Sequence, residues 1–380
     1  MAGPSEKVSK APPYKLLALD GGGIRGLISL EFLAQIQELL QRELKAPDDF
    51  VLADYFDYIA GTSTGAIIAT CLALGWRVER VRELYLASGV QMFDRAGLLR
   101  RFHYKFEDER LAELLQQHFG AETTLGSDRL RTLLMLVMRN ASTDSPWPIT
   151  NNPAAKYSDL SRPTNNLHLP LWQLVRASTA APTYFPPEVI EIGSRSFVFV
   201  DGGVTLYNNP AFQLFLMATV EPYRLCWSAG EDRMLLVSVG TGISADANLN
   251  LVPGEMNLLY NASSVPSALM SAASVEQDFL CRIFGRTRCG GVIDVEVGDM
   301  MTQANLRGPV HPKLFSYMRY NMDLSRAGLD ELGFPALMPT DVQALDSIAH
   351  MDDLRAIGAA AAERQLRTEH FDGFLLPTRQ

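Results

Sequence analysis

Residues 55–74 read YFDYIAGTSTGAIIATCLAL, and this stretch decides the fold. An apolar, strand-like run leads into the sequence GTSTG at residues 61–65, and a helix-like run follows it. A serine flanked by Gly-x and x-Gly at a strand-to-helix junction is the pattern of a nucleophile elbow. The turn strains the backbone of Ser63, so Gly61 and Gly65 must lack the bulk that would hold strand and helix apart. The N-terminus of the helix then faces Ser63, where negative charge develops during nucleophilic attack.

Strand-like and helix-like runs alternate over the first 250 residues. The predicted strands are 15–19, 55–60, 133–138, 197–200 and 234–239. The predicted helices between them are 27–44, 66–74, 78–88, 171–179 and 211–220. This alternation predicts an α/β fold, with a mostly parallel sheet covered by helices on both faces. Beyond residue 250 the sequence is mainly helical, with one strand at 315–322 and a last helix at 352–366. We therefore predict a disordered leader over 1–13, a catalytic domain over 14–250 and a mainly helical C-terminal part over 251–380.

Composition narrows the classes of partner and compartment. The chain of 380 residues carries a net charge of −9, which argues against binding to a nucleic-acid polymer. No apolar run has the ~18–20 residues needed to cross a bilayer, and the polar N-terminus lacks a secretory signal. We therefore expect a cytoplasmic protein. The four cysteines show no metal-ligand spacing, so we expect them to be reduced and expect no metal site.

The glycine loop DGGGIRG at residues 20–26 has two interpretations. Gly21, Gly23 and Gly26 form a literal G-x-G-x-x-G between a strand and a helix, as in dinucleotide-binding folds. Such a fold needs an acidic residue at the end of the next strand, but the region around Glu43 is still helix, and Arg25 is unusual beside a pyrophosphate. Alternatively, consecutive glycines expose neighbouring N–H groups that stabilise an oxyanion. This second interpretation places Gly22 and Gly23 beside Ser63.

A nucleophilic serine needs a base. Asp201 follows the strand-like run 197–200, so its carboxylate is expected to emerge at a strand end. A Ser–Asp–His triad would need a histidine after Asp201, and His311, in a loop between prolines, is the candidate. The residues alone leave the triad and a dyad without histidine open.

Three motifs in this order, DGGGIRG, GTSTG and DGG (201–203), resemble the patatin-like phospholipases. The resemblance covers residues 14–210 and implies a three-layer α/β/α fold with a Ser–Asp dyad. It implies that Ser63 is the nucleophile and Asp201 the base, with Gly21, Gly22, Gly23 and Arg25 forming the oxyanion region. It also implies a serine lipid acyl hydrolase that needs no cofactor and acts on phospholipids at the inner face of the membrane.

A finer resemblance concerns regulation. The stretch WPITNNPAAKY at 147–157 and the C-terminal tail look like bacterial patatins that a cyclic nucleotide activates in antiphage defence. This implies a cyclic di- or trinucleotide activator, although 150–152 also fits an ordinary polar turn. Residues 95–106 alternate apolar and basic side chains, as in an interfacial lid or as in a plain solvated helix. A constitutive hydrolase, a dinucleotide-binding protein and a non-catalytic interaction protein remain the alternative functions.

Overall fold

The computed structural model describes residues 4–93, 105–159, 161–162, 164–182, 184–243, 258–293, 296–301 and 310–375. Within them the chain forms one nine-stranded sheet, with the order β5-β6-β3-β2-β1-β7-β9-β8 and with β4 paired to β3. The strands are β1 (Tyr14–Leu19), β2 (Tyr58–Thr62), β3 (Leu133–Asn140), β4 (Ser145–Thr150), β5 (Glu188–Ile192), β6 (Arg195–Asp201), β7 (Met234–Val239), β8 (Arg286–Cys289) and β9 (Ser316–Tyr320). Strands β3, β2, β1, β7, β9 and β8 run parallel, whereas β4, β5 and β6 add antiparallel pairs at one side.

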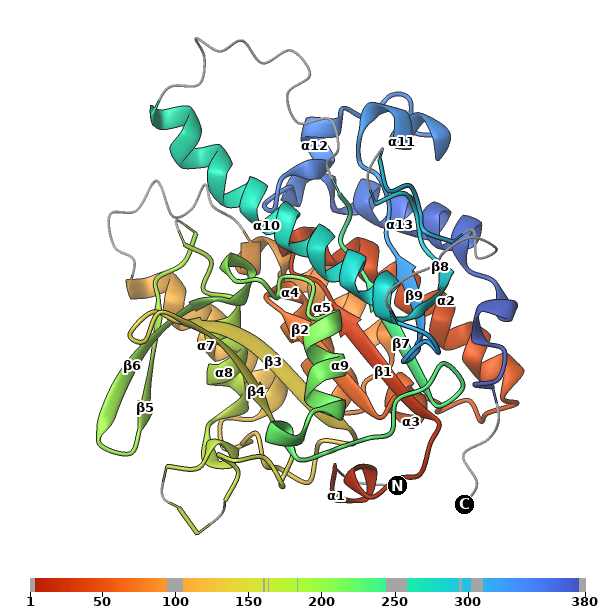
Figure 1. Ribbon diagram of the computed structural model, residues 1–380. Helices are drawn as coiled ribbons and strands as arrows, with labels where there is room; N and C mark the ends of the chain where they lie inside the picture. The colour runs from red at the N-terminus through yellow and green to blue at the C-terminus, as the bar shows by residue number, and fades with distance from the viewer. Residues whose placement is uncertain are drawn as a thin grey trace.

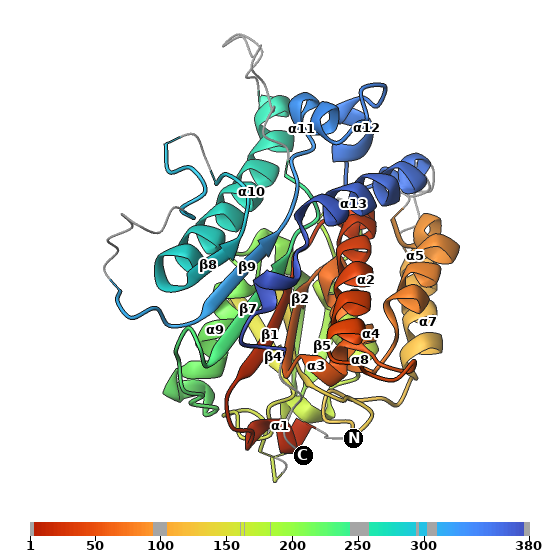
Figure 2. The ribbon, with the colours of Figure 1, turned by 90° about the vertical axis from the view of Figure 1, so that its right-hand side faces the viewer.

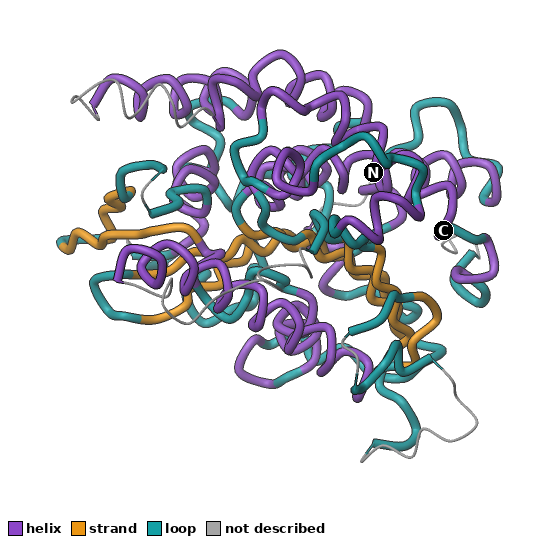
Figure 3. The backbone as a smooth tube through the Cα atoms, turned by 90° about the horizontal axis from the view of Figure 1, so that it is seen from above, coloured by secondary structure: helices purple, strands orange, loops and turns teal. Residues whose placement is uncertain are grey.

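Helices cover both faces of the sheet, as the alternating sequence predicts (Figures 2 and 3). The helices are α1 (Pro4–Val8), α2 (Gly26–Glu43), α3 (Leu52–Tyr55), α4 (Thr64–Ala73), α5 (Val78–Phe93), α7 (Lys105–Phe119), α8 (Leu171–Ser178), α9 (Ala211–Thr219), α10 (Leu258–Phe284), α11 (Arg326–Glu331), α12 (Pro339–Gln343) and α13 (Met351–Gln365). Alternate residues of β1 divide between two cores because side chains of a strand point to opposite faces. Leu17 and Leu19 pack with α2, α4 and α13, while Leu16 and Ala18 pack with α9. The result is a three-layer α/β/α fold.

Strands β2 and β6 meet end to end beside β3. Strand β4 occupies one edge of β3 over residues 135–140, and β2 pairs with residues 133–137. Because β6 pairs with residues 138–140, it must share the other edge with β2. Strand β2 runs parallel to β3 and β6 runs antiparallel, so their carboxyl ends converge. This topology brings the residues that follow β2 and those that end β6 to one point.

The part beyond residue 250 continues the same sheet. Strands β8 and β9 extend it past β7, and α10 and α13 pack on its opposite faces (Figure 1). The expected strand at 315–322 is β9, and the region is otherwise mainly helical, as predicted. The sequence did not predict strands β4, β5 and β8, nor helices α3 and α7. The boundary at residue 250 stays a prediction.

The leader is folded where the structure describes it. Residues 4–8, which we predicted to be disordered, form helix α1. Lys7 and Lys10 bind the fully buried Asp57 carboxylate at 3.1 and 2.7 Å, so burial of Asp57 draws this segment onto the domain. Among the described helices, none is long and apolar enough to cross a membrane.

Candidate active site

Ser63 occupies a strained turn between β2 and α4. Its backbone has φ 55° and ψ −122°, an uncommon conformation for a residue with a side chain. The turn is tight, because a Cβ added to Gly61 would lie 2.0 Å from the carbonyl oxygen of Gly65. A Cβ added to Gly65 would lie 2.3 Å from the carbonyl oxygen of Leu19 in β1. Both glycines of the predicted elbow therefore allow close backbone approach.

The Ser63 hydroxyl donates a hydrogen bond to Asp201. The distance from Ser63 Oγ to Asp201 Oδ2 is 2.6 Å, and the other carboxylate oxygen accepts the N–H of Gly203 at 2.6 Å. Asp201 pairs with Met138 in the sheet, one position beyond the last pair of β2 with β3. The convergence of β2 and β6 thus brings together two residues that are 138 positions apart.

Asp201 is buried, and this changes its acidity. Burial raises the pKa of its carboxyl from 3.8 to about 6, while the hydrogen bonds from Ser63 and Gly203 and the charge of Arg176 oppose the shift. Desolvation disfavours the charged form of a carboxyl group. A carboxylate with this pKa is a stronger base than an exposed one and is still mostly ionised at pH 7.

A second hydrogen bond fixes the turn. The backbone N–H of Ser63 donates to Ser178 Oγ at 3.0 Å, and the Ser178 hydroxyl donates to the carbonyl oxygen of Val137 at 2.6 Å. Ser178 ends α8, and Val137 lies in β3 beside the end of β2. Sequence reasoning gave Ser178 no role. Its hydroxyl links the elbow to the neighbouring strand.

The glycine loop follows β1 and lies next to Ser63. A Cβ added to Gly21 would lie 3.3 Å from Ser63 Cβ, which places this loop in contact with the elbow. The N–H of Gly21 donates to the carbonyl oxygen of Asn208 at 3.0 Å. Within the described residues, the N–H groups of Gly22 and Gly23 donate no hydrogen bond. Among Gly21, Gly22 and Gly23, the last two therefore keep an available donor.

Arg25 turns back onto its own loop. Its Nε donates to the carbonyl oxygen of Gly22 at 3.4 Å. Burial lowers the pKa of its guanidinium to about 10, and the charge of Asp20 opposes this shift, so the group is cationic at neutral pH. Arg25 therefore adds positive charge beside the glycine loop.

Asn208 is a residue of this site that sequence reasoning missed. Its side-chain amide group donates to Ser274 Oγ at 3.1 Å, and Ser274 in turn donates to the carbonyl oxygen of Met270 in α10. Its Oδ1 therefore faces away from α10, toward Gly21 and Gly203, and is buried without a hydrogen-bond partner among the described residues. The sequence signal was the pair Asn208-Asn209, which follows the DGG motif by only a few residues.

Segments beyond residue 300 support the glycine loop. The carbonyl oxygen of Leu345 accepts the N–H of Ile24 at 2.9 Å. Arg319 of β9 binds both carboxylate oxygens of Asp20, at 2.9 and 2.6 Å, and each side chain is only 5% exposed. The loop is thus held at both ends by the C-terminal part.

Other residues singled out from the sequence lie elsewhere. His311 is exposed, and none of the hydrogen bonds of Ser63 and Asp201 within the described residues involves a histidine. The segment predicted as a lid, 95–106, lies outside the residues whose side chains are described. Within the described residues there is no cluster of His, Cys, Asp and Glu side chains suited to a metal ion.

The fold and this arrangement define an α/β protein with a strained serine paired to a buried aspartate. A family model for patatin-like phospholipases matches residues 17–215, just over half of the chain. The chain belongs to this family.

Relatives are similar over part of their length. The chain is 29% identical over 273 residues to an intracellular phospholipase A2 of Caenorhabditis elegans, covering 71% of this chain and 21% of that protein. It is 30% identical over 238 residues to a cGAMP-activated phospholipase of Escherichia coli (strain TW11681), covering 60% and 62%. The chain therefore spans less than two thirds of each. The structure of VipD from Legionella pneumophila aligns with a TM-score of 0.40 at 14% identity, over 90% of this chain and 67% of that one.

Proposed function

We propose that this protein is a serine lipid acyl hydrolase that cleaves acyl esters of phospholipids through Ser63 and Asp201. The observation that carries the proposal is the 2.6 Å hydrogen bond between Ser63 Oγ and Asp201 Oδ2 at a strained strand–helix turn. A general base must lie within hydrogen-bond distance of the proton that it removes, and Asp201 does. The pKa of about 6 supports this role, because a base works best with a pKa near the operating pH.

The reaction follows from these positions. Ser63 Oγ bonds to the carbonyl carbon of the ester while its proton passes to Asp201 Oδ2. The carbonyl oxygen becomes an oxyanion, which accepts hydrogen bonds from the N–H groups of Gly22 and Gly23. The alcohol of the lipid leaves with the proton from Asp201, and an acyl group remains on Ser63. A water molecule then attacks the carbonyl carbon of the acyl group while its proton passes to Asp201. The fatty acid is released, and the proton returns to Ser63 Oγ.

Exposed apolar side chains beside the site support a lipid substrate. Val204 and Leu206, which follow the DGG motif, are 37% and 54% exposed. Leu269 of α10 is 65% exposed, and its neighbour Met270 lies against Gly203. Large apolar groups that border a catalytic site favour acyl chains over a polar ester. We place the enzyme in the cytoplasm, acting at the inner face of the membrane.

We further propose that a cyclic di- or trinucleotide activates the enzyme, as part of an antiviral response. The support is the similarity to a relative whose name is cGAMP-activated phospholipase, together with the stretch 147–157. A constitutive hydrolase is the alternative.

The dinucleotide-binding alternative is not favoured. A Cβ added to Gly22 would lie 2.1 Å from Thr241 Oγ1, and the carbonyl oxygen of Leu345 lies against Gly23. The glycine loop is thus packed against other parts of the chain on these sides.

The test is labelling with a fluorophosphonate followed by lipid analysis. We expect the wild type to be labelled. We expect it to release fatty acid from phosphatidylglycerol and phosphatidylethanolamine vesicles, and separate arms with and without cyclic GMP–AMP test whether the nucleotide increases this release. Ser63→Ala should show neither labelling nor release. The matched control Ser161→Ala removes an exposed hydroxyl that donates a hydrogen bond to Asp159, and this variant should still be labelled. Labelling of Ser63→Ala at wild-type level would overturn the assignment of the nucleophile.

A further inference from the structure

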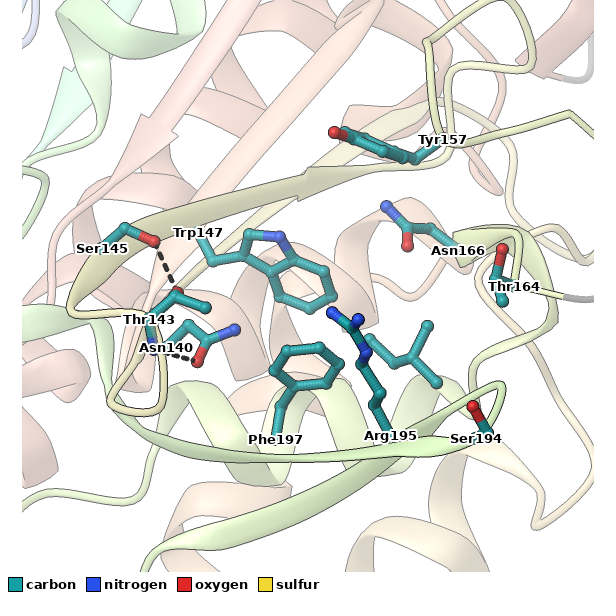
Figure 4. Close-up of a pocket in the computed structure, with 11 residues that line it drawn as sticks. Asn140, Thr143, Ser145, Trp147, Tyr157, Thr164, Asn166, Ser194, Arg195 and Phe197 are labelled. Atoms are coloured by element: carbon teal, nitrogen blue, oxygen red, sulfur yellow. Dashed lines mark hydrogen bonds between the residues drawn. The ribbon is translucent and has the colours of Figure 1, made fainter.

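A cavity of about 570 Å³ lies away from the serine, between the β3–β4 turn, the β5–β6 hairpin and the loop around residues 157–166 (Figure 4). Its volume is within the range of small-molecule sites. Trp147 and Tyr157, the two ends of the stretch singled out from the sequence, both line it. The proposed hydrolysis makes no use of this cavity.

Aromatic rings and a single cation characterise its lining. Figure 4 shows the guanidinium of Arg195 beside the indole of Trp147 and near the ring of Phe197. The eleven lining residues include no Asp or Glu, although the whole chain carries a net charge of −9. In the part of the chain that the structure describes, Arg195 makes no ion pair or hydrogen bond. An exposed arginine beside aromatic rings is suited to an anion that also carries a flat ring.

Amide groups add donors at the rim. The Oδ1 of Asn140 accepts the N–H groups of Ser142 and Thr143, so its amide NH2 is the group left for a ligand. The side chain of Asn166 lies on the other side of Trp147 and is not engaged within the described residues (Figure 4). An amide NH2 donates to the ring nitrogens and carbonyl oxygens of a base.

We propose that this cavity is the binding site for the cyclic nucleotide, a step that rests on the proposed activation. A purine base stacks on Trp147, a phosphate binds Arg195, and Asn140 and Asn166 contact the base edge. Every base has a flat face that stacks on an aromatic side chain. A phosphate pairs with an arginine through two parallel N–H bonds.

The sheet joins this cavity to the catalytic carboxylate. Trp147 pairs with Met138 on one edge of β3, and Asp201 pairs with Met138 on the other. Trp147, Met138 and Asp201 therefore lie side by side on three neighbouring strands. Because neighbouring strands are about 4.8 Å apart, the backbones of Trp147 and Asp201 are about 10 Å apart. The Trp147 ring also stacks on Phe199, two residues before Asp201, with ring centroids 4.8 Å apart. A ligand that prefers one position of Trp147 therefore biases the position of Asp201.

The experiment is calorimetric titration of the full chain with cyclic GMP–AMP, cyclic di-AMP, cyclic tri-AMP and AMP. We expect at least one cyclic nucleotide to bind the wild type. Trp147→Leu and Arg195→Ala should each weaken its binding about tenfold or more, as expected for one lost stack or phosphate contact. Arg162→Ala, which removes a nearby exposed arginine outside the lining, should bind as the wild type does. Ser63→Ala should also bind, because its nucleophile is far from the ligand.

The outcomes distinguish three claims: the location of the nucleotide site, activation by a nucleotide, and the hydrolase activity. Melting temperatures without ligand confirm that the variants are folded, and Arg195→Lys, which keeps the charge, should recover part of the affinity. Unchanged binding in both Trp147→Leu and Arg195→Ala would overturn the location of the site while leaving activation intact. No binding of any nucleotide to the wild type would overturn the site and the activation, whereas fluorophosphonate labelling would still report the hydrolase. Binding of sn-glycerol 3-phosphate in place of the nucleotides would assign the cavity to a lipid headgroup instead.

Discussion

The two ends of strand β6 lie in contrasting surroundings. At one end, Asp201 is buried, and its two carboxylate oxygens accept hydrogen bonds from the Ser63 hydroxyl and the Gly203 N–H group. At the other end, Arg195 is exposed above an open cavity and makes no polar contact with the described residues. The buried end is held by two hydrogen bonds at the strand junction, whereas the exposed end keeps side-chain groups available for a ligand. One strand can thus carry a buried catalytic group at one end and a ligand-binding group at the other.

The largest effect should come from breaking the buried end. Asp201→Asn keeps the size of the side chain but removes the base, so we expect ester hydrolysis to fall by about 10⁴-fold or more. Ser63→Ala should have a comparable effect, and the double variant should be no worse than the worse single one, because the two residues act as one unit. Steady-state hydrolysis of a soluble acyl ester measures this. If the loss in the double variant equalled the product of the two single losses, Ser63 and Asp201 would act independently. If His311→Ala lost activity while Asp201→Asn kept it, the enzyme would use a triad.

A smaller effect is expected at the glycine loop beside this end. Gly23 has φ +61°, and a Cβ there would lie 2.2 Å from the carbonyl oxygen of Leu345. Gly23→Ala should therefore displace an oxyanion donor, with a loss of about 10²–10³-fold in kcat, and should also lower the melting temperature. Gly333→Ala is the matched control, since Gly333 has φ +89° with open space around it. It should cost about 1–2 kcal/mol of stability from the left-handed backbone and leave kcat unchanged. Equal kcat in the two variants would remove Gly23 from the proposed site.

The smallest effect is a difference in pH dependence between the two ends. Asp201 acts as a base only when ionised, and its pKa is about 6. Hydrolysis should therefore rise about fivefold from pH 5 to pH 6 and level off above pH 7. Nucleotide binding through Arg195 should be nearly flat over the same range, because arginine stays charged. Parallel pH profiles of kcat/KM and of calorimetric affinity would show this contrast, and a flat profile of kcat/KM would contradict the role of Asp201.

The same pKa sets the pH dependence of stability. The folded pKa of Asp201 lies above the ordinary value of 3.8, so the folded state holds a proton more tightly than the unfolded chain does. The free energy of unfolding contributed by this group therefore falls as the pH rises from about 4 to about 6, and then stays constant. Burial of the base thus reduces stability at neutral pH in exchange for basicity.

Much of the fold could be predicted because its signals are local. The strand before Ser63, the helix after it and the glycines on both sides lie within one short stretch, and the structure has both elements. Their bounds differ from the prediction: the strand is Tyr58–Thr62 rather than 55–60, because Tyr55 ends helix α3, and the helix is Thr64–Ala73 rather than 66–74. The expected strands in β1, β3 and β7 are also buried apolar runs, whereas β6 is only partly buried. Strand β4 was missed because Pro146 and Pro148 interrupt its pattern. Strand β5 was missed because it is short and two of its five residues are glutamates.

What the sequence could not provide is contact between distant segments. Nothing near Gly21 indicates that Asn208 accepts its N–H group, and nothing near Asp20 indicates Arg319. The cavity at Trp147 depends on three loops that meet only in the folded chain. The aspartate was found because it belongs to a motif, but its distance from Ser63 follows from β2 and β6 sharing one edge of β3.

The brace formed by Arg319 and Leu345 has a consequence for the timing of synthesis. Ser63 and Asp201 leave the ribosome before the residues that hold Asp20 and Ile24. At 5–20 residues per second, the stretch between Asp201 and Leu345 takes roughly seven to thirty seconds to translate. During that interval the nascent chain already carries its nucleophile and base, but its glycine loop lacks the contacts with Arg319 and Leu345. The glycine loop would thus gain both contacts only after translation has passed residue 345, which ties completion of the site to synthesis of the C-terminal part.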